Sequence, residues 1–428
     1  MRISQKFKQT KIVMLWLLVY VSSSCARTYR AFVPLPVGNI TPHGWLLDRL
    51  EAQARGLDGS LDKWWPQVSK SLWISPHGNA TVPGLRAPST ERVPYWLNGM
   101  VPLHALLHNA NASSPEAIST GESCSRFIGH ILAHQDPESG WLGPNKTGRE
   151  DVFWPRYYLL MALRLRAEST NSTHERATLI RAMTRHVHAS DAKMAAQNWS
   201  SPTFQSPGGI SKIRVQDYLA SLVWLLRHAP ASERNFLSHH ASTVLAVYRD
   251  QVDWERWFAS LPSGGPGCAH QRVWNKTCLG KWAMHTHGVS SAMAIKSASV
   301  LFELEQELGQ KPNQTLRQLS IQRMHDLDAL YGSPLGLTIA DESYPSGPLD
   351  AEAKRKPPSR GTELCAIVEA LFSMAEMFSV FGHIPFADRA ERIAFNALPA
   401  AWGGPAHPGG EGGSDQWAHQ YFSCANQV

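Results

Sequence analysis

The chain has 428 residues, of which 43% are apolar and 18% charged, and it can therefore bury a large core. This composition excludes low-complexity disorder for most of the chain. The net charge of +6 overstates the basicity, because four basic and no acidic residues lie in positions 1–26. The rest of the chain is nearly neutral. Its one basic cluster, at residues 354–356, favours a solvated loop over a nucleic-acid patch.

The first 26 residues have the layout of a secretory signal peptide. Basic residues up to Lys11 precede an apolar run from Ile12 to Val21, and small residues follow up to Ala26. The apolar run is ten residues long, whereas a helix needs about 20 residues to cross a bilayer. We therefore predict cleavage near Ala26 and secretion, without a stable membrane anchor.

Eight N-glycosylation sequons are spread along the chain. Behind a signal peptide, eight copies of Asn, any residue but proline, and Ser or Thr predict a glycoprotein. Because a glycan needs solvent, each asparagine is expected in a surface loop or at a helix end. The asparagines are Asn39, Asn79, Asn111, Asn145, Asn171, Asn198, Asn275 and Asn313.

Apolar residues recur at helical spacing in long segments separated by Pro-, Gly- and Ser-rich loops, with few strand patterns. An all-α architecture follows. No sequence repeat of fixed length is visible, which suits a barrel of paired helices better than a solenoid. The predicted helices include residues 101–107, 153–165, 215–226, 289–308, 364–381 and 386–398.

Five cysteines remain after residue 26, and an odd number in an oxidising compartment leaves at least one unpaired, metal-bound or paired elsewhere. Cys268 and Cys278 flank a short Gly- and Pro-rich loop that also carries a sequon. A bridge that closes so short a loop contributes roughly 2–3 kcal/mol. We predict a local disulfide between Cys268 and Cys278. The states of Cys124 and Cys424 stay open.

Two polar segments before the most apolar helix carry side chains that can bind a sugar or transfer a proton. His285 and His287 precede a predicted helix, where either can hydrogen-bond a sugar hydroxyl or cap the helix. Asp341 and Glu342 lie in the long Pro- and Gly-rich loop over 331–360. A carboxyl group placed near a nucleophile can serve as general acid and base. As an isolated pair, Asp341 and Glu342 are more typical of a surface.

The clearest helix begins beside two possible metal ligands. Thr362 is its predicted N-cap, and Gly382 is predicted to end it. Glu363 and Cys365 at its start can offer a carboxylate oxygen and a thiolate to zinc, which accepts both. On spacing alone, the pair is more typical of a carboxylate near a helix start beside a small buried thiol.

Six short segments, spread over most of the chain, together match the order of motifs in one known family. They are Val93–Gly99 (VPYWLNG), Trp154–Tyr158 (WPRYY), Thr286–Val289 (THGV), Gly361–Ala370 (GTELCAIVEA), Asp388–Pro399 (DRAERIAFNALP) and Trp417–Tyr421 (WAHQY). From about residue 35 to the end, the chain thereby resembles the β-L-arabinofuranosidases of glycoside hydrolase family 127 and their relatives.

The resemblance implies an (α/α)6 barrel over residues 27–428, with a zinc ion held by one Glu and three Cys, one of which is the nucleophile. Glu363 and Cys365 match two of the zinc ligands, Glu342 matches the acid/base glutamate, and His287 matches a substrate-contacting histidine. The implied activity is retaining hydrolysis of arabinose-containing or related plant-type glycans. A thiolate would attack the anomeric carbon while Glu342 protonates the leaving oxygen and then activates water.

The family's other two zinc ligands form an adjacent Cys-Cys pair after the His-Gln-Tyr segment, where this chain has only Cys424. The family's C-terminal β-sandwich domains are also expected to be absent. The resemblance therefore predicts a truncated chain that binds zinc weakly or not at all and is inactive as given.

Two other functions stay open. A barrel that has lost its nucleophile can bind glycans without cleaving them, and another helical-barrel carbohydrate hydrolase, such as an unsaturated-uronide hydrolase, needs no metal. The sixteen tryptophans suit a sugar binder, since indole rings stack on the apolar faces of sugars, although most are expected in the core.

Overall fold

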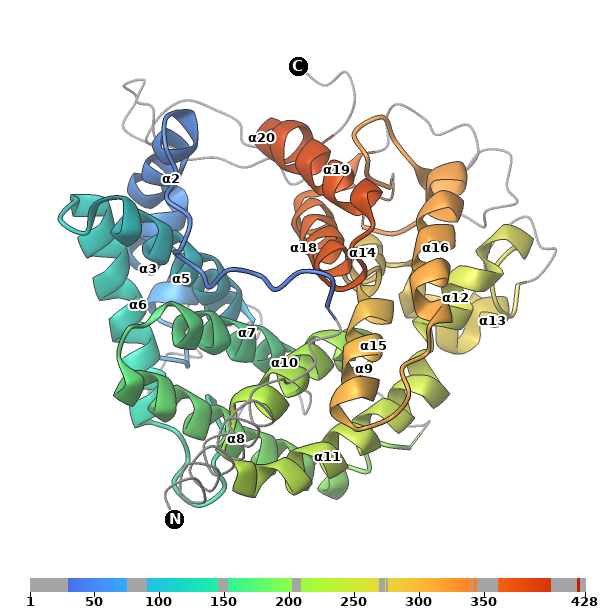
Figure 1. Cartoon of the computed structure of the whole chain (residues 1–428), viewed down its shortest axis with the longest axis horizontal. Helices are drawn as coiled ribbons and strands as arrows, with labels where there is room; N and C mark the ends of the chain where they lie inside the picture. Colours follow the sequence, from blue (N-terminus) through green and yellow to red (C-terminus); the bar gives the residue numbers. More distant parts are fainter. Residues whose placement is uncertain are drawn as a thin grey trace, which may run out of the picture.

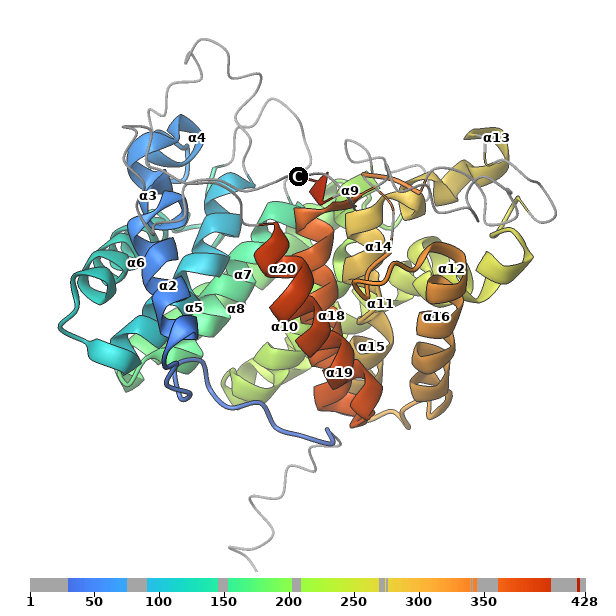
Figure 2. The ribbon, with the colours of Figure 1, turned by 90° about the horizontal axis from the view of Figure 1, so that it is seen from above.

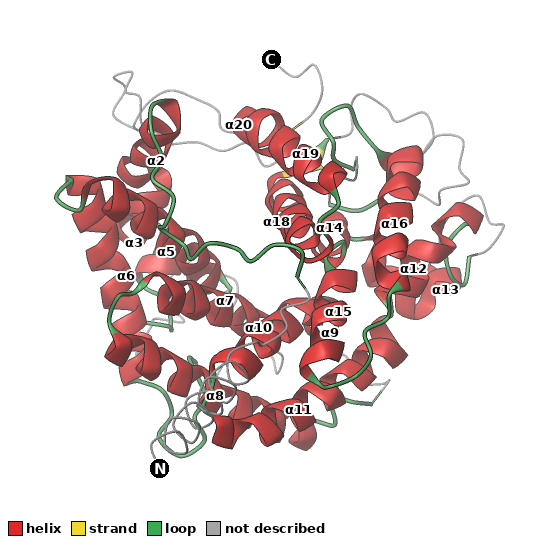
Figure 3. Ribbon diagram, viewed as in Figure 1, coloured by secondary structure: helices red, strands yellow, loops and turns green. Residues whose placement is uncertain are grey.

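The structure is a computed structural model that describes residues 30–74, 91–144, 153–201, 209–268, 274, 276–338, 340, 342–344, 361–401 and 422–423. These residues are mostly helical (Figure 3). Their two strands, β1 (Thr362–Glu363) and β2 (Phe422–Ser423), pair antiparallel. The predicted mainly helical class is confirmed for the described residues.

The longer helices form two curved layers (Figure 1). Helices of the inner layer lie side by side in chain order, and each is backed by an outer helix that follows it in the chain. The inner helices are α5 (Arg92–Asn111), α7 (Phe153–Ser169), α10 (Val215–His228), α14 (Gly288–Ala294) continued by α15 (Ser297–Glu307), and α18 (Leu364–Phe381). The outer helices are α6 (Pro115–Ala133), α8 (Thr173–Ala196), α11 (Arg234–Val247), α16 (Thr315–Tyr331) and α19 (Ile384–Arg392).

The N-terminal part of the described chain joins the two ends of this arrangement. Helices α2 (Trp45–Arg55), α3 (Leu57–Trp64) and α4 (Pro66–Ser69) pack against α5. The segment before α2 crosses to α18, where the backbone N–H groups of Ala31 and Phe32 donate to carbonyls of Val380 and Ser379 at 3.1 and 2.9 Å (Figure 1).

Short helices complete the described fold. Of these, α4, α9 and α13 lie at one end of the helix layers (Figure 2). The predicted disulfide is present and joins Cys268 to Cys278 of α13. Besides α4, the short elements are α9 (Ile210–Ile213), η2 (Ala231–Glu233), η3 (Tyr248–Val252), α12 (Trp254–Ser260), η4 (Leu261–Ser263), α13 (Lys276–Leu279), η5 (Gly280–Thr286), η6 (Ile393–Ala397) and α20 (Leu398–Ala400).

Helix α18 has the predicted bounds, and Gly382 ends it in a left-handed conformation with φ of 65°. The predicted N-cap is wrong. Thr362 lies in β1 and donates its hydroxyl to the carbonyl of Thr338 at 3.0 Å, while Glu363 occupies the cap position without a side-chain cap. The helix is long and apolar enough to span a membrane, yet it packs against α14, α15 and α19, as a core helix does.

The helix predicted over 289–308 is interrupted between α14 and α15. Side chains from other helices take up the carbonyl groups freed there. Ser373 donates to the carbonyl of Ala292 at 2.7 Å, and Arg323 donates to those of Ala294 and Ile295 at 3.2 and 3.1 Å. Such inserted donors explain a break that the apolar pattern does not reveal.

Candidate active site

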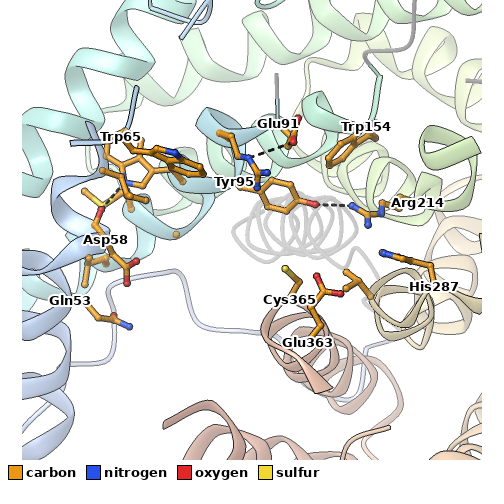
Figure 4. A pocket seen from close by; sticks show the side chains of 17 residues that line it. Gln53, Asp58, Trp65, Glu91, Tyr95, Trp154, Arg214, His287, Glu363 and Cys365 are labelled. Carbon is orange, nitrogen blue, oxygen red and sulfur yellow. Dashed lines mark hydrogen bonds and ion pairs between the residues drawn. The ribbon is translucent and has the colours of Figure 1, made fainter. Parts of the chain in front are cut away.

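A cavity of about 790 Å³ lies at the beginnings of the inner helices (Figure 4). Its lining includes the first residues of α5, α14 and α18, together with Trp154 at the start of α7 and Arg214 just before α10. Residues of α2, α3 and the α3–α4 junction close the opposite side. Because the inner helices begin here, their N-termini give this region a positive dipole potential.

Three of the residues singled out from the sequence meet in this cavity. His287, Glu363 and Cys365 all line it, although His287 is far from the other two in the chain. Figure 4 shows Glu363 and Cys365 on one wall, with Arg214 and His287 on the adjoining one. The Glu363 side chain is buried, whereas Cys365 is exposed to the cavity. The expectation of a small buried thiol at Cys365 is therefore wrong.

The Cys365 thiol is accessible from the cavity, but protein atoms crowd around it. This partial burial, together with the neighbouring Glu363 carboxylate, raises the pKa of the thiol to about 12. Arg214 opposes this rise only in part. In the metal-free protein Cys365 is therefore a neutral thiol at neutral pH, and it is a weak nucleophile in that form.

Arg214 is a cavity residue that the sequence analysis missed. Its guanidinium group is buried, donates to the Tyr95 hydroxyl at 2.8 Å and lies 5.0 Å from the ring centroid of Trp154. It also reaches the Ser290 hydroxyl at 3.4 Å. These contacts fix a permanent positive charge beside Cys365. A polar residue before the apolar run of α10 was the only signal for it in the sequence.

A buried ionic network lies below Tyr95. The Tyr95 ring packs on Tyr158 with centroids 3.9 Å apart, and the Tyr158 hydroxyl donates to Glu369 at 2.9 Å. The ammonium group of Lys296 lies 3.6 Å from Glu369 and 2.8 Å from Asp217. Burial alone would lower the pKa of Lys296, but the two carboxylates outweigh it and raise that pKa. The network thus places the Lys296 ammonium group between two carboxyl groups in the core behind the cavity.

His287 has a structural role as well as a place in the cavity. It is the N-cap of α14, and its Nδ1 accepts from the backbone N–H of Ser290 at 3.4 Å. Burial, and then Arg214, lower the pKa of His287 to about 4. The unfolded chain binds a proton below about pH 6.5 that the folded chain binds only near pH 4. The contribution of His287 to the free energy of unfolding is therefore lost as the pH falls from about 6.5 to about 4.

Glu342 is held close to His287 by the backbone. The Gly288 N–H donates to the Glu342 carbonyl at 2.9 Å, and the Tyr344 N–H donates to the Thr286 carbonyl at 2.9 Å. The negative charge of Glu342 acts on the His287 ring and opposes the fall in its pKa. The side chain is exposed and is not part of the cavity lining. Asp341 lies outside the described residues.

His285 does not enter the cavity. It is buried beside Trp254 and Trp257, and its Nε2 lies 2.7 Å from the Val252 carbonyl. Its role in the described structure is therefore packing. His285 neither faces the cavity, where it could contact a sugar, nor caps α14.

The described residues do not by themselves fit zinc. Within them, no three His, Cys, Asp or Glu side chains are placed to hold one metal ion. Glu363 and Cys365 supply two donors, whereas a protein zinc site uses three or four. Cys424 and the segment 417–421 lie outside the described residues.

The sequons that the structure describes are all on the surface. As predicted, their asparagines are exposed in loops or at helix ends; they are Asn39, Asn111, Asn171, Asn198 and Asn313. Asn79, Asn145 and Asn275 lie outside the described residues, as does the predicted signal peptide.

Eight of the thirteen described tryptophans are buried, as expected.

No family model and no curated protein matches the sequence. Among solved structures, one titled "Glycoside hydrolase" is similar, with a TM-score of 0.54 and 13% sequence identity. The match covers 88% of this chain and 53% of that protein, so the chain spans about half its length. At this identity the likeness shows the fold alone: the chain has a helical fold like that of a glycoside hydrolase.

Proposed function

We propose that residues 27–428 form an (α/α)6-barrel domain of a retaining glycoside hydrolase of the β-L-arabinofuranosidase type, which binds arabinose-containing or related plant-type glycans in the cavity. One observation carries the proposal. His287, Glu363 and Cys365, which the family resemblance singles out, line one cavity together with the buried Arg214 and several aromatic rings, Tyr95 and Trp154 among them. The glycoside hydrolase fold supports it.

The chemistry of the described residues suits glycoside binding and proton transfer. Trp154 and Tyr95 offer aromatic surface for the apolar face of a sugar, while Arg214 and neutral His287 can hydrogen-bond its hydroxyls. Glu342, held beside His287, is the proposed general acid and base. Since the described residues supply only two donors for zinc, we assign no step to a metal.

The proposal can be tested on the 428-residue protein by calorimetric titration with a disaccharide of two L-arabinofuranose units. We expect binding at one site per chain, well under one zinc per chain by elemental analysis, and no measurable release of arabinose. The last two results are expected because the described residues supply only two zinc donors.

The control is the His287→Ala variant, which removes a cavity side chain and should weaken the binding. If the wild-type protein binds no arabinose-containing glycan, the proposed function is wrong. If it carries stoichiometric zinc and hydrolyses the disaccharide robustly, the expectation of too few zinc ligands is wrong and the proposed function stands. Unchanged binding in the His287→Ala variant would show that the glycan binds outside this cavity.

We also propose that the protein is secreted and N-glycosylated, which the exposure of all five described sequon asparagines supports. Expression in a eukaryotic secretory host should release a protein that loses mass on endoglycosidase treatment. Retention of an uncleaved, unglycosylated chain in the cytosol would contradict this prediction.

A further inference from the structure

The cavity has a second wall that the proposed chemistry does not use. Figure 4 shows Trp65 and Asp58 across the cavity from Cys365 and Glu363. A volume of about 790 Å³ is in the range of pockets that hold drug-sized ligands, about 300–1,000 Å³. A single pentose is far smaller than such ligands. The cavity therefore has room for a second sugar unit against this wall.

Trp65 is fixed in place by its backbone. It lies at the junction of α3 and α4, where its N–H donates to the Leu61 carbonyl at 2.9 Å and its carbonyl accepts from Val68 and Ser69, both at 2.8 Å. Pro66 follows it and disfavours a helical conformation at Trp65, which is extended with ψ of 111°. The backbone of Trp65 is thereby held in place, and its half-buried indole lines the cavity.

Polar groups frame the indole. The Arg92 guanidinium lies over one face of the Trp65 ring, 5.3 Å from its centroid, and its Nε donates to the Gln67 side chain at 3.1 Å. The buried Trp96 donates its indole N–H to the Asp58 carbonyl at 2.8 Å, which ties α3 to α5 and steadies the wall. Arg92 and the Asp58 carboxylate line the same part of the cavity and offer a donor and an acceptor to hydroxyl groups.

We propose that Trp65, with Arg92 beside it, forms a second sugar subsite that binds the unit on the leaving-group side of the glycosidic bond. The indole face that Arg92 does not cover stacks on the apolar face of that sugar ring, and Arg92 and Asp58 bind its hydroxyls. The preferred ligand is then a disaccharide or longer glycan. This inference rests on the proposed function, because it assumes that the first sugar lies at the wall of Cys365 and His287.

The test compares Trp65→Ala with Trp64→Ala in the 428-residue protein. Trp64 is the adjacent residue of the same type, but its side chain is 66% exposed and does not line the cavity. Calorimetry would measure two ligands, methyl β-L-arabinofuranoside and the disaccharide of two L-arabinofuranose units. We expect Trp65→Ala to weaken disaccharide binding about 3- to 10-fold and to leave the methyl glycoside unchanged. Trp64→Ala should change neither affinity.

A Trp65→Phe variant guards against a folding defect, since it keeps a stacking ring and should retain most of the disaccharide affinity. Equal losses for both ligands in Trp65→Ala, or no loss for either, would overturn the subsite. If Trp65→Ala has no effect while His287→Ala weakens both ligands, the subsite fails and the proposed function stands. If the wild-type protein binds neither ligand, both fail.

Discussion

Replacing Lys296 by methionine is expected to lower the free energy of unfolding by about 3–5 kcal/mol, because it leaves buried carboxylates without their cation. The Lys296 side chain is fully buried between α10 and α18. It pairs with Asp217 and Glu369 and lies 4.7 Å from the ring centroid of Phe372. Methionine fills a similar volume, so the lost charge dominates the effect. Urea unfolding followed by circular dichroism measures the change.

The matched control is Lys311→Met, at an exposed lysine in the loop before α16, which should stay within about 0.5 kcal/mol of the wild type. Removing both charges in Lys296→Met, Asp217→Leu should destabilise less than the two single changes added together, since the partners interact directly. A Lys296→Met protein as stable as the Lys311→Met protein would show that the network carries no such penalty.

In any form of this protein that releases arabinose, Glu342→Gln is expected to lower turnover by about 10²–10⁴-fold. Glutamine keeps the shape of the side chain but cannot transfer a proton. The loss should be smaller for a nitrophenyl arabinofuranoside than for a disaccharide, since nitrophenolate departs without protonation. Initial rates with both substrates, at a pH where the wild type is active, measure the effect.

Glu138→Gln serves as the control, because Glu138 is an exposed glutamate outside the cavity lining. It should leave turnover unchanged. A Glu342→Gln protein within a factor of about three of the wild type would reject Glu342 as the general acid and base. Glu352, which lies outside the described residues, would then be the next candidate.

Local patterns predicted part of the fold well. The apolar face and the terminal glycine of α18 are properties of consecutive residues, and its bounds followed from them. The cap at Thr362 and the break between α14 and α15 did not, because partners distant in the chain decide both. Thr338 takes the Thr362 hydroxyl, and Ser373 and Arg323 take the free carbonyls at the break.

The candidate site divides in the same way. His287, Glu363 and Cys365 were found because they belong to short motifs with a recognised spacing. Arg214 and Trp65 were missed, since neither lies in such a motif and both enter the cavity only when separate helices pack together. An isolated arginine or tryptophan in a sequence is as typical of packing as of binding. Only the assembled cavity distinguishes the two.

The most direct test of the proposed glycan site is a crystal structure of the 428-residue protein with the disaccharide of two L-arabinofuranose units bound. We predict one furanose ring beside Cys365, Glu363 and His287, within reach of Arg214, and the second ring stacked on Trp65. A disaccharide bound elsewhere on the protein, or an empty cavity at a saturating concentration, would contradict the assignment of this cavity as the glycan-binding site.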